Sequence, residues 1–239
     1  MATWMTLDGV NCEDVGLHVL EYPARCVPRR RYTKKKIPGG KEIIIYDGVQ
    51  GYENMLLTAQ IYFDGQTDAD RAIAFLLPES REIIFGDQPE YCYQGMVDEQ
   101  IDFDRIFRER KPCRFKVNFL CSPYRQLSAP GEGIVVTEAG VIVHPGSARS
   151  HPLIRAYGSG DGAIVLREQE TIRLTGLKED EALVIDSGAM ICTDEAYSMD
   201  KSRQMTGDYP YLEPGENAIV TSGGVTRIEI EPRFAWLGR

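Results

Sequence analysis

The chain has 239 residues, of which 43% are hydrophobic, and a formal net charge of -9. This length and composition suit one large β domain or two smaller ones, and they exclude a disordered chain. No apolar run is long enough to span a bilayer, and no signal-peptide pattern is visible at the N-terminus, so a soluble protein made in the cytoplasm is expected. An acidic chain is also a poor candidate for general nucleic-acid binding.

The first half of the chain is predicted to be mixed α and β. Apolar and polar residues alternate from Met55 to Phe63, which is typical of a strand with one buried face. The only helix is expected over 67–77, with Thr67 as its N-cap, Asp70 in its first turn and Pro78 at its end. Further strands are expected at 16–20, 41–46, 81–85, 91–97 and 113–121.

A basic segment lies between Glu21 and Glu42. It carries eight Lys and Arg residues and no acidic residue. The rest of the chain therefore has 19 of the 27 bases and all 36 acidic residues. Three prolines stiffen the segment, which favours an arm that reaches across a neighbouring molecule over a disordered tail. A nucleic-acid contact, with Tyr32 stacking on a base, is the alternative. The candidate contact residues are Arg29, Arg30, Arg31, Lys34, Lys35 and Lys36.

Six cysteines and three histidines are scattered without a CxxC pair. Their spacing indicates neither a zinc site nor a disulfide framework, and no cofactor is expected. The cysteines are interpreted as small apolar residues with free thiols. Cys113 and Cys121 illustrate this, because alternate residues between them share one face of a predicted strand.

Residues 122–133 (SPYRQLSAPGEG) carry the turn formers of a linker, and the helical pattern disappears beyond them. The second half is predicted to be all β, with short strands spaced as in a sandwich. Strands around Ile164–Leu166 and Ile172–Leu174 are separated by a turn at 168–170, and short strands follow at 182–186 and 189–192. A last hairpin is expected over 218–230, with Gly223 and Gly224 as a two-residue turn.

The stretch GDYPYLEPGENAIV, residues 207–220, concentrates prolines, glycines and tyrosines just before this last β segment. Tyr209-Pro210 and Pro214-Gly215 fix extended and turned backbone at low entropic cost. The stretch is therefore interpreted as a rigid corner that sets the register of the strands after it, in preference to a loop that builds a binding site.

The motif LVIDSGA, residues 183–189, matches the aspartate signature of aspartic proteases, in which two such loops meet and two carboxylates share a proton. An enzyme with a single motif must form a dimer around Asp186, and the apolar-apolar-Gly brace that such enzymes need is missing. The preferred interpretation is an Asp-Ser-Gly turn between two strands, so no catalysis is expected.

Several further residues carry a resemblance to a known family. In the first half they are Gly16-Leu17, Pro38-Gly39, the single helix and Pro123-Tyr124. In the second half they are Pro152, Ile154, Gly158, Gly160, Ile185, Asp186, Tyr209, Pro210, Leu212, Pro214, Gly215, Asn217, Pro232 and Arg233. Over nearly its whole length the chain resembles the distal tail proteins (Dit) of bacteriophages with long non-contractile tails.

The resemblance implies a mainly β fold: an N-terminal α+β domain over 1–130, with strands, one helix and an arm at 23–41, followed by a galectin-like β-sandwich over 131–239. It implies a structural baseplate hub and not an enzyme, in which a homo-hexameric ring joins the tail tube protein to the tail-associated tip protein. DNA passes through the ring without specific binding, and receptor-binding proteins are further candidate partners. The location implied is the virion tail tip, after assembly in the bacterial host cytoplasm.

A carbohydrate-binding module for host cell-wall glycans is the alternative function, because galectin-like sandwiches bind sugars. Sugar sites usually offer an exposed aromatic platform beside polar groups. The two tryptophans, Trp4 and Trp236, lie near the ends of the chain and no long insertion is present, so the hub is preferred.

Overall fold

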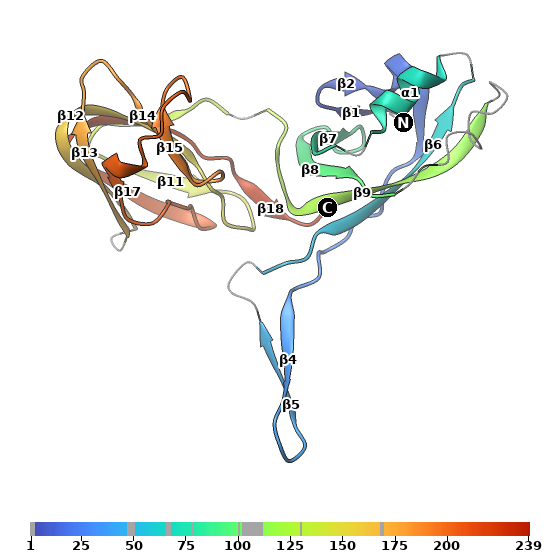
Figure 1. The fold of residues 1–239 in the computed structure, drawn as a ribbon, viewed down its shortest axis with the longest axis horizontal. Helices are drawn as coiled ribbons and strands as arrows, with labels where there is room; N and C mark the ends of the chain where they lie inside the picture. Colours follow the sequence, from blue (N-terminus) through green and yellow to red (C-terminus); the bar gives the residue numbers. More distant parts are fainter. Residues whose placement is uncertain are drawn as a thin grey trace. The chain divides into compact units, whose positions relative to one another are not determined.

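The computed structural model describes residues 3–46, 51–65, 68–77, 79–99, 101, 112–129, 131–167 and 170–239. The described chain is mainly β with one α-helix, which confirms the predicted fold class (Figure 1). It divides into two compact units, the first formed by Met1–Ala129 with Leu237–Arg239 and the second by Pro130–Trp236. No helix in the described ranges is long and apolar enough to cross a membrane.

The first unit is built on one antiparallel sheet in the order β2-β1-β7-β8-β9-β6-β3, and β18 pairs with β9. A short 3-10 helix, Cys12–Val15, connects β2 to β3. The strands are β1 (Met5–Leu7), β2 (Val10–Asn11), β3 (Leu17–Glu21), β6 (Met55–Phe63), β7 (Arg81–Phe85), β8 (Tyr91–Val97) and β9 (Cys113–Leu127). The short strand β18 (Ala235–Leu237) enters this unit only with its last residue.

The alternation predicted for 55–63 defines the core face of this sheet. Every second residue of β6, from Met55 to Phe63, is at most 4% exposed. The facing residues of β9 include Phe119 and Cys121, both fully buried. Burial raises the pKa of the Cys121 thiol to about 12. Cys121 is therefore a small core residue, and all six cysteines are unpaired.

Helix α1 (Ala69–Phe75) covers part of this core with Ala72 and Phe75. Asp68 is its N-cap, because the Asp68 carboxylate accepts a hydrogen bond from the N–H of Asp70 at 3.2 Å. The predicted cap, Thr67, and the predicted stop, Pro78, lie outside the described residues.

The last residues of the chain belong to the first unit, although the sequence placed all of 131–239 in the second domain. The N–H of Gly238 donates to the carbonyl of Pro123 at 2.9 Å, and the N–H of Arg239 donates to that of Cys26 at 2.9 Å. The Arg239 side chain is 1% exposed and donates to the Pro23 carbonyl and to Asp87. These contacts fasten the chain end beside residues 23–26.

The second unit is an eight-stranded sheet in which the central path is β10-β17-β12-β13-β16. β11 pairs with β17, while β14 pairs with both β12 and β15. Its strands are β10 (Ile134–Val136), β11 (Ala139–His144), β12 (Leu153–Leu166), β13 (Glu170–Leu177), β14 (Leu183–Asp186), β15 (Ile191–Asp194), β16 (Met205–Thr206) and β17 (Gly215–Glu231). A second 3-10 helix, Ser202–Gln204, precedes β16.

Two long strands, β12 and β17, run through both layers of the second unit. The first part of β12 pairs with β14, whereas its last part, 162–166, pairs with β13. Likewise β17 pairs with β11 through residues 215–220 and with β10 through 228–230. One cluster of buried side chains includes residues from both parts, among them Ile164 and Ile230, so the two parts form the facing layers of a sandwich.

Glycines allow both strands to turn the corner between the layers. A Cβ atom added at Gly158 would overlap the carbonyl oxygen of Gly224, and one added at Gly224 would overlap that of Ser159. The hairpin predicted over 218–230 with a two-residue turn is therefore wrong: Gly223 and Gly224 lie inside the single strand β17, where it bends beside β12.

Candidate interaction site

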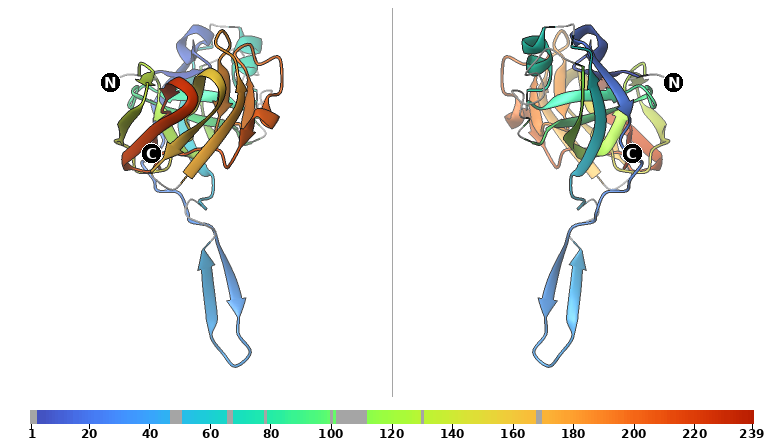
Figure 2. Two further views of the ribbon diagram at one scale, coloured as in Figure 1. Left: turned by 90° about the vertical axis from the view of Figure 1, so that its left-hand side faces the viewer. Right: turned by 90° about the vertical axis from the view of Figure 1, so that its right-hand side faces the viewer.

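The basic segment forms the outgoing half of a β-hairpin, which we call the arm (residues 29–46 and 51–53). Its strands are β4 (Tyr32–Lys36) and β5 (Glu42–Tyr46), a two-stranded sheet separate from the others (Figure 2). At the base of the hairpin, the N–H of Arg31 donates to the carbonyl of Gly51 at 2.6 Å. The N–H of Glu53 donates to the carbonyl of Arg29 at 2.8 Å. The arm thus includes a returning strand beyond the 23–41 limits predicted from the sequence.

All six candidate contact residues are exposed on the arm. Arg29, Arg30 and Arg31 lie at its base, and Lys34, Lys35 and Lys36 lie on β4. The Lys34 ammonium group is 3.8 Å from the Glu42 carboxylate across the hairpin. Lys35 and Lys36 form no ion pair with any residue that the structure describes. Since neighbouring residues of a strand point to opposite faces, both faces of the arm are basic.

Aromatic rings organise the base of the arm. Tyr32 and Tyr46 face each other across the strand pair, with ring centroids 6.4 Å apart. The Arg29 guanidinium donates to the Tyr32 hydroxyl at 2.8 Å, and the Arg30 guanidinium lies 4.6 Å from the centre of the Tyr46 ring. Because Tyr32 is engaged by Tyr46 and Arg29, its geometry does not favour the predicted stacking on a nucleic-acid base.

The arm also exposes apolar residues that the sequence prediction did not include in the site. Ile43, Ile44 and Ile45 on β5 are 44%, 50% and 48% exposed. They pair directly with Lys35, Lys34 and Thr33 on β4. The available signal was two strand-like runs around Pro38-Gly39-Gly40, which is a hairpin pattern. A surface that mixes bases with three consecutive isoleucines suits a protein partner better than a nucleic acid.

The second candidate region, residues 207–220, is a corner held by Asn217. Asn217 is fully buried, and its amide N–H groups donate to the carbonyls of Glu213 at 2.8 Å and Gly215 at 3.0 Å. Its amide oxygen accepts from the N–H of Glu213 at 2.9 Å. The hydrogen bonds of the Asn217 side chain go to the loop itself and to β11. The geometry therefore favours a structural corner over a binding site.

Two arginines fix the outer side of this corner. The guanidinium groups of Arg149 and Arg167 lie 4.1 Å and 4.2 Å from the centre of the Tyr211 ring. The Arg149 Nε donates to the Glu213 carboxylate at 2.7 Å, and Arg167 Nη1 is 3.6 Å from the same oxygen. The hydrogen bond and charge of Glu213 raise the pKa of Arg149. Tyr211 is covered by these cations and offers no free platform for a sugar.

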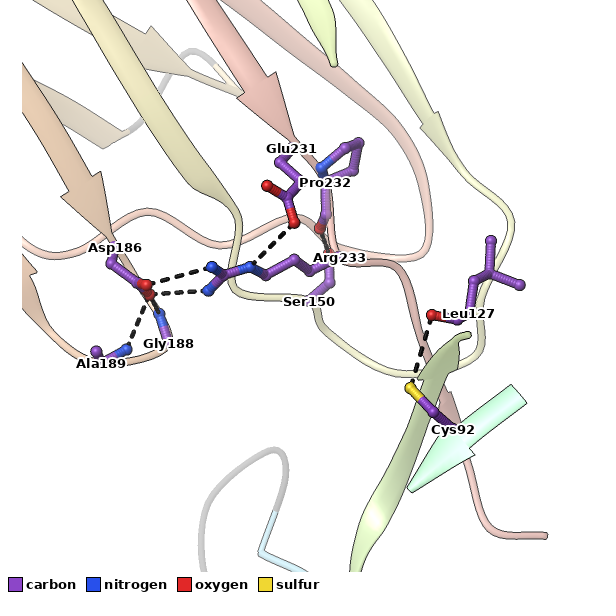
Figure 3. A network of polar contacts seen from close by, with 9 residues as sticks. All are labelled: Cys92, Leu127, Ser150, Asp186, Gly188, Ala189, Glu231, Pro232 and Arg233. Atoms are coloured by element: carbon purple, nitrogen blue, oxygen red, sulfur yellow. Dashed lines mark hydrogen bonds and ion pairs between the residues drawn. The ribbon is translucent and has the colours of Figure 1, made fainter. Parts of the chain in front are cut away.

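Asp186 ends β14 and caps the turn that follows it (Figure 3). Its Oδ1 accepts hydrogen bonds from the N–H groups of Gly188 and Ala189, both at 3.0 Å. The Arg233 guanidinium binds both carboxylate oxygens, at 2.9 Å and 3.2 Å, and its Nε lies 3.7 Å from Glu231. Burial alone would raise the pKa of Asp186, but these hydrogen bonds and the Arg233 charge hold it below its ordinary value.

This environment favours the turn interpretation of LVIDSGA over the protease. In an aspartic protease two neighbouring aspartates share one proton, so the two carboxylates cannot both be ionised. Here the side chain of Asp186 is 12% exposed, and its carboxylate is neutralised as an anion by Arg233. No group of three or more His, Cys, Asp and Glu side chains that could hold a metal ion occurs in the described part of the chain.

The fold thus combines a single-sheet unit with one helix and a basic hairpin, and a two-layered β-sandwich. This combination defines a class of two-unit β proteins that includes a solved phage tail component. The chain superposes on the Dit protein of phage SPP1 with a TM-score of 0.71 and 16% sequence identity, over 97% of this chain and 99% of that one. That structure is described as a paradigm of the hub adsorption apparatus in phages that infect Gram-positive bacteria.

The resemblance to distal tail proteins is therefore confirmed at the level of the fold. No protein-family model and no curated sequence matches the chain.

Proposed function

We propose that the chain is a structural phage tail-tip protein, a hub located at the distal end of the tail. The observation that carries the proposal is the shared fold with SPP1 Dit, which extends over both units and almost the full length of both chains. The Asp186 carboxylate is bound by Arg233 at a turn, an arrangement that suits a structural role.

The finer proposal is a homo-hexameric ring that joins the tail tube protein to the tail-associated tip protein, with DNA passing through its lumen. The arm is proposed as the link between neighbouring subunits. Its bases suit an acidic surface, and the chain outside the segment between Glu21 and Glu42 has 19 bases against 36 acids. Its isoleucines add apolar area, so the contact is expected to combine charge pairing with burial of Ile43 and Ile45.

Reversal of four arm charges tests this link. Exposed ion pairs contribute ~0.2–1 kcal/mol each, so one substitution is tolerated but four act together. The variant carrying Arg30→Glu, Arg31→Glu, Lys35→Glu and Lys36→Glu should shift hexamers toward monomers in mass photometry. The matched control reverses four exposed bases elsewhere: Arg71, Lys178, Arg203 and Arg227.

Three outcomes of this experiment can be distinguished. Hexamers in the natural protein and the control, with monomers in the arm variant, support both ring and link. Rings of unchanged size in the arm variant at low protein concentration would show that the arm contacts a tube or tip protein instead. A monomeric natural protein that binds cell-wall glycans on an array would favour the carbohydrate-binding alternative.

A further inference from the structure

Three sulfur-containing side chains gather where the arm joins the first unit. Cys26 lies just before the outgoing half of the arm, and Met55 begins β6 just after the returning half ends. The Cys26 thiol donates to the Met55 thioether, with the two sulfur atoms 3.8 Å apart. Cys121 on β9 is the direct strand partner of Met55. We call Cys26, Met55 and Cys121 the sulfur cluster.

The strand register and the packing bring the third sulfur atom to the other two. Direct partners in an antiparallel pair lie on the same face of the sheet, with Cβ atoms about 5 Å apart. Met55 and Cys121 both point into the core of the first unit, where they are 4% and 0% exposed. Cys26 is half-buried and packs against the same core. The cluster is therefore screened from water on all sides except at Cys26, where an ion can enter.

The ligand chemistry of the cluster is soft. Thiolate and thioether sulfur atoms select Cu(I), whereas Mg²⁺ and Ca²⁺ prefer oxygen ligands. Zinc is a poorer candidate, because its structural sites use four Cys, His or carboxylate ligands and a thioether is not among them. In a trigonal site with metal–sulfur bonds of about 2.3 Å, the length of a zinc–thiolate bond, the sulfur atoms lie about 4 Å apart. The 3.8 Å between Cys26 and Met55 fits this spacing.

Arg239 places a positive charge beside the cluster. Its backbone N–H donates to the Cys26 carbonyl at 2.9 Å, and its side chain is 1% exposed. Burial raises the pKa of the Cys121 thiol and the charge of Cys26 raises it further, whereas the charge of Arg239 lowers it. Each thiol that binds a metal ion must release its proton, so a buried cation beside the sulfur atoms favours the bound state. Asp87 shares this charge, because it pairs with Arg239 at 2.6 Å.

We propose that the sulfur cluster is a binding site for Cu(I), a soft monovalent cation, with the sulfur atoms of Cys26, Met55 and Cys121 as its three ligands. One ion binds per chain. The ion connects the segment before the arm and the strand after it to β9. It therefore clamps both ends of the hairpin to the sheet of the first unit and stabilises this unit by its binding free energy.

The inference goes beyond the proposed function and does not depend on a ring, because all three ligands belong to the first unit. A chain that is not a tail-tip hub still binds the ion. Loss of the cluster removes metal binding and leaves the charges of the arm in place, so the two proposals fail separately.

Anaerobic titration of the full chain with Cu(I), buffered by the chelator bicinchoninate, tests the proposal. The natural protein should withdraw one Cu(I) per chain from the chelator. Met55→Leu keeps the core volume but removes the thioether, and Cys26→Ser removes one thiolate. Each should raise the dissociation constant for Cu(I) by at least about tenfold, since even the outer partners of a metal site contribute that much.

Cys113→Ser is the matched control. Cys113 is also half-buried and also belongs to β9, but it lies opposite Phe63 at the far end of the strand. Its replacement should leave the affinity for Cu(I) unchanged. Circular dichroism confirms that each variant is folded.

X-ray absorption of the Cu(I)-loaded protein identifies the ligands. Three sulfur atoms at about 2.3 Å are expected, falling to two in Met55→Leu, a change that a purely structural role of Met55 would not cause. Absence of Cu(I) uptake by the natural protein, a first shell of nitrogen or oxygen, or an equal loss of affinity in Cys113→Ser and Cys26→Ser would overturn the proposal. A first shell that is the same in Met55→Leu and the natural protein would remove Met55 from the site.

Discussion

Replacement of Arg239 by alanine is expected to destabilise the first unit strongly. The Arg239 side chain is 1% exposed and its Nη2 lies 2.6 Å from Asp87, whose side chain is 30% exposed. Its Nη1 donates to the Pro23 carbonyl, and its guanidinium lies 5.0 Å from the centre of the Phe85 ring. The substitution removes all three interactions, and the Pro23 carbonyl loses the guanidinium as its hydrogen-bond donor.

The magnitude follows from these contacts. The charge-assisted bond to Asp87 contributes about 1.5 kcal/mol, at the low end of its range because Asp87 is partly solvated. The bond to Pro23 adds about 1 kcal/mol, and the stacking over Phe85 adds about 1 kcal/mol. The free energy of unfolding should therefore fall by about 3.5 kcal/mol, equivalent to roughly 12 °C in the melting temperature of a unit of this size.

Differential scanning calorimetry measures the loss, and hydrogen exchange with mass spectrometry locates it. Faster exchange is expected at residues 23–26 and 85–87 and not in the sandwich. Arg114→Ala is the control, because Arg114 is an exposed arginine in the same unit, and it should change stability by less than about 0.5 kcal/mol. A loss below 1 kcal/mol for Arg239→Ala, or exchange that rises equally in both units, would refute this reasoning.

Two further outcomes are expected in the second unit. Gly224→Ala forces a methyl group onto the Ser159 carbonyl and should lower the unfolding free energy by about 3 kcal/mol in urea titration, whereas Gly131→Ala, with open space around it, should be neutral. Asp186→Asn should destabilise by about 2 kcal/mol at neutral pH. The pKa of Asp186 is lower in the folded than in the unfolded protein, so the stability that the ionised carboxylate contributes is fully present above its unfolded pKa of ~3.9. That stability is lost as the pH falls through the folded pKa. The difference in unfolding free energy between the variant and the natural protein, which we call the gap, should therefore close in acid. A gap that stays constant in acid would exclude the Asp186–Arg233 pair as its source.

Local patterns predicted the parts of the fold that depend on local physics. The alternation in 55–63 identified β6 because a strand with one buried face needs apolar residues at every second position. The helix was found from its apolar stripe, and its N-cap is Asp68. The predicted cap, Thr67, lies outside the described residues, and sequence alone does not separate two neighbouring residues that both favour the N-cap.

The glycine pair at 223–224 shows why the rest was not predictable. A Gly-Gly pair between two alternating runs is the usual signal of a hairpin. In the structure the same pair permits a bend of β17 against Gly158, about 65 positions earlier in the sequence. Sequence reveals that the backbone needs freedom at this point, but not which distant segment lies against it.

The arm shows a related limit for the candidate site. Its bases were found from composition, yet the run Ile43–Ile45 was interpreted as an ordinary strand, because three consecutive isoleucines normally indicate burial. Only the separate pairing of β4 with β5 shows that these side chains are left in solvent.

The composition of the arm has a consequence for how a ring would assemble. A two-stranded hairpin is marginally stable in water, so the order of β4 and β5 is expected to be reinforced by binding. Under the proposed function, Lys35 and Lys36 would guide the arm to acidic surface and so act mainly on the rate of association, which salt slows. The exposed isoleucines act differently, because burial of apolar area is insensitive to moderate salt and slows dissociation. Assembly should therefore become slower in salt before the finished ring becomes unstable.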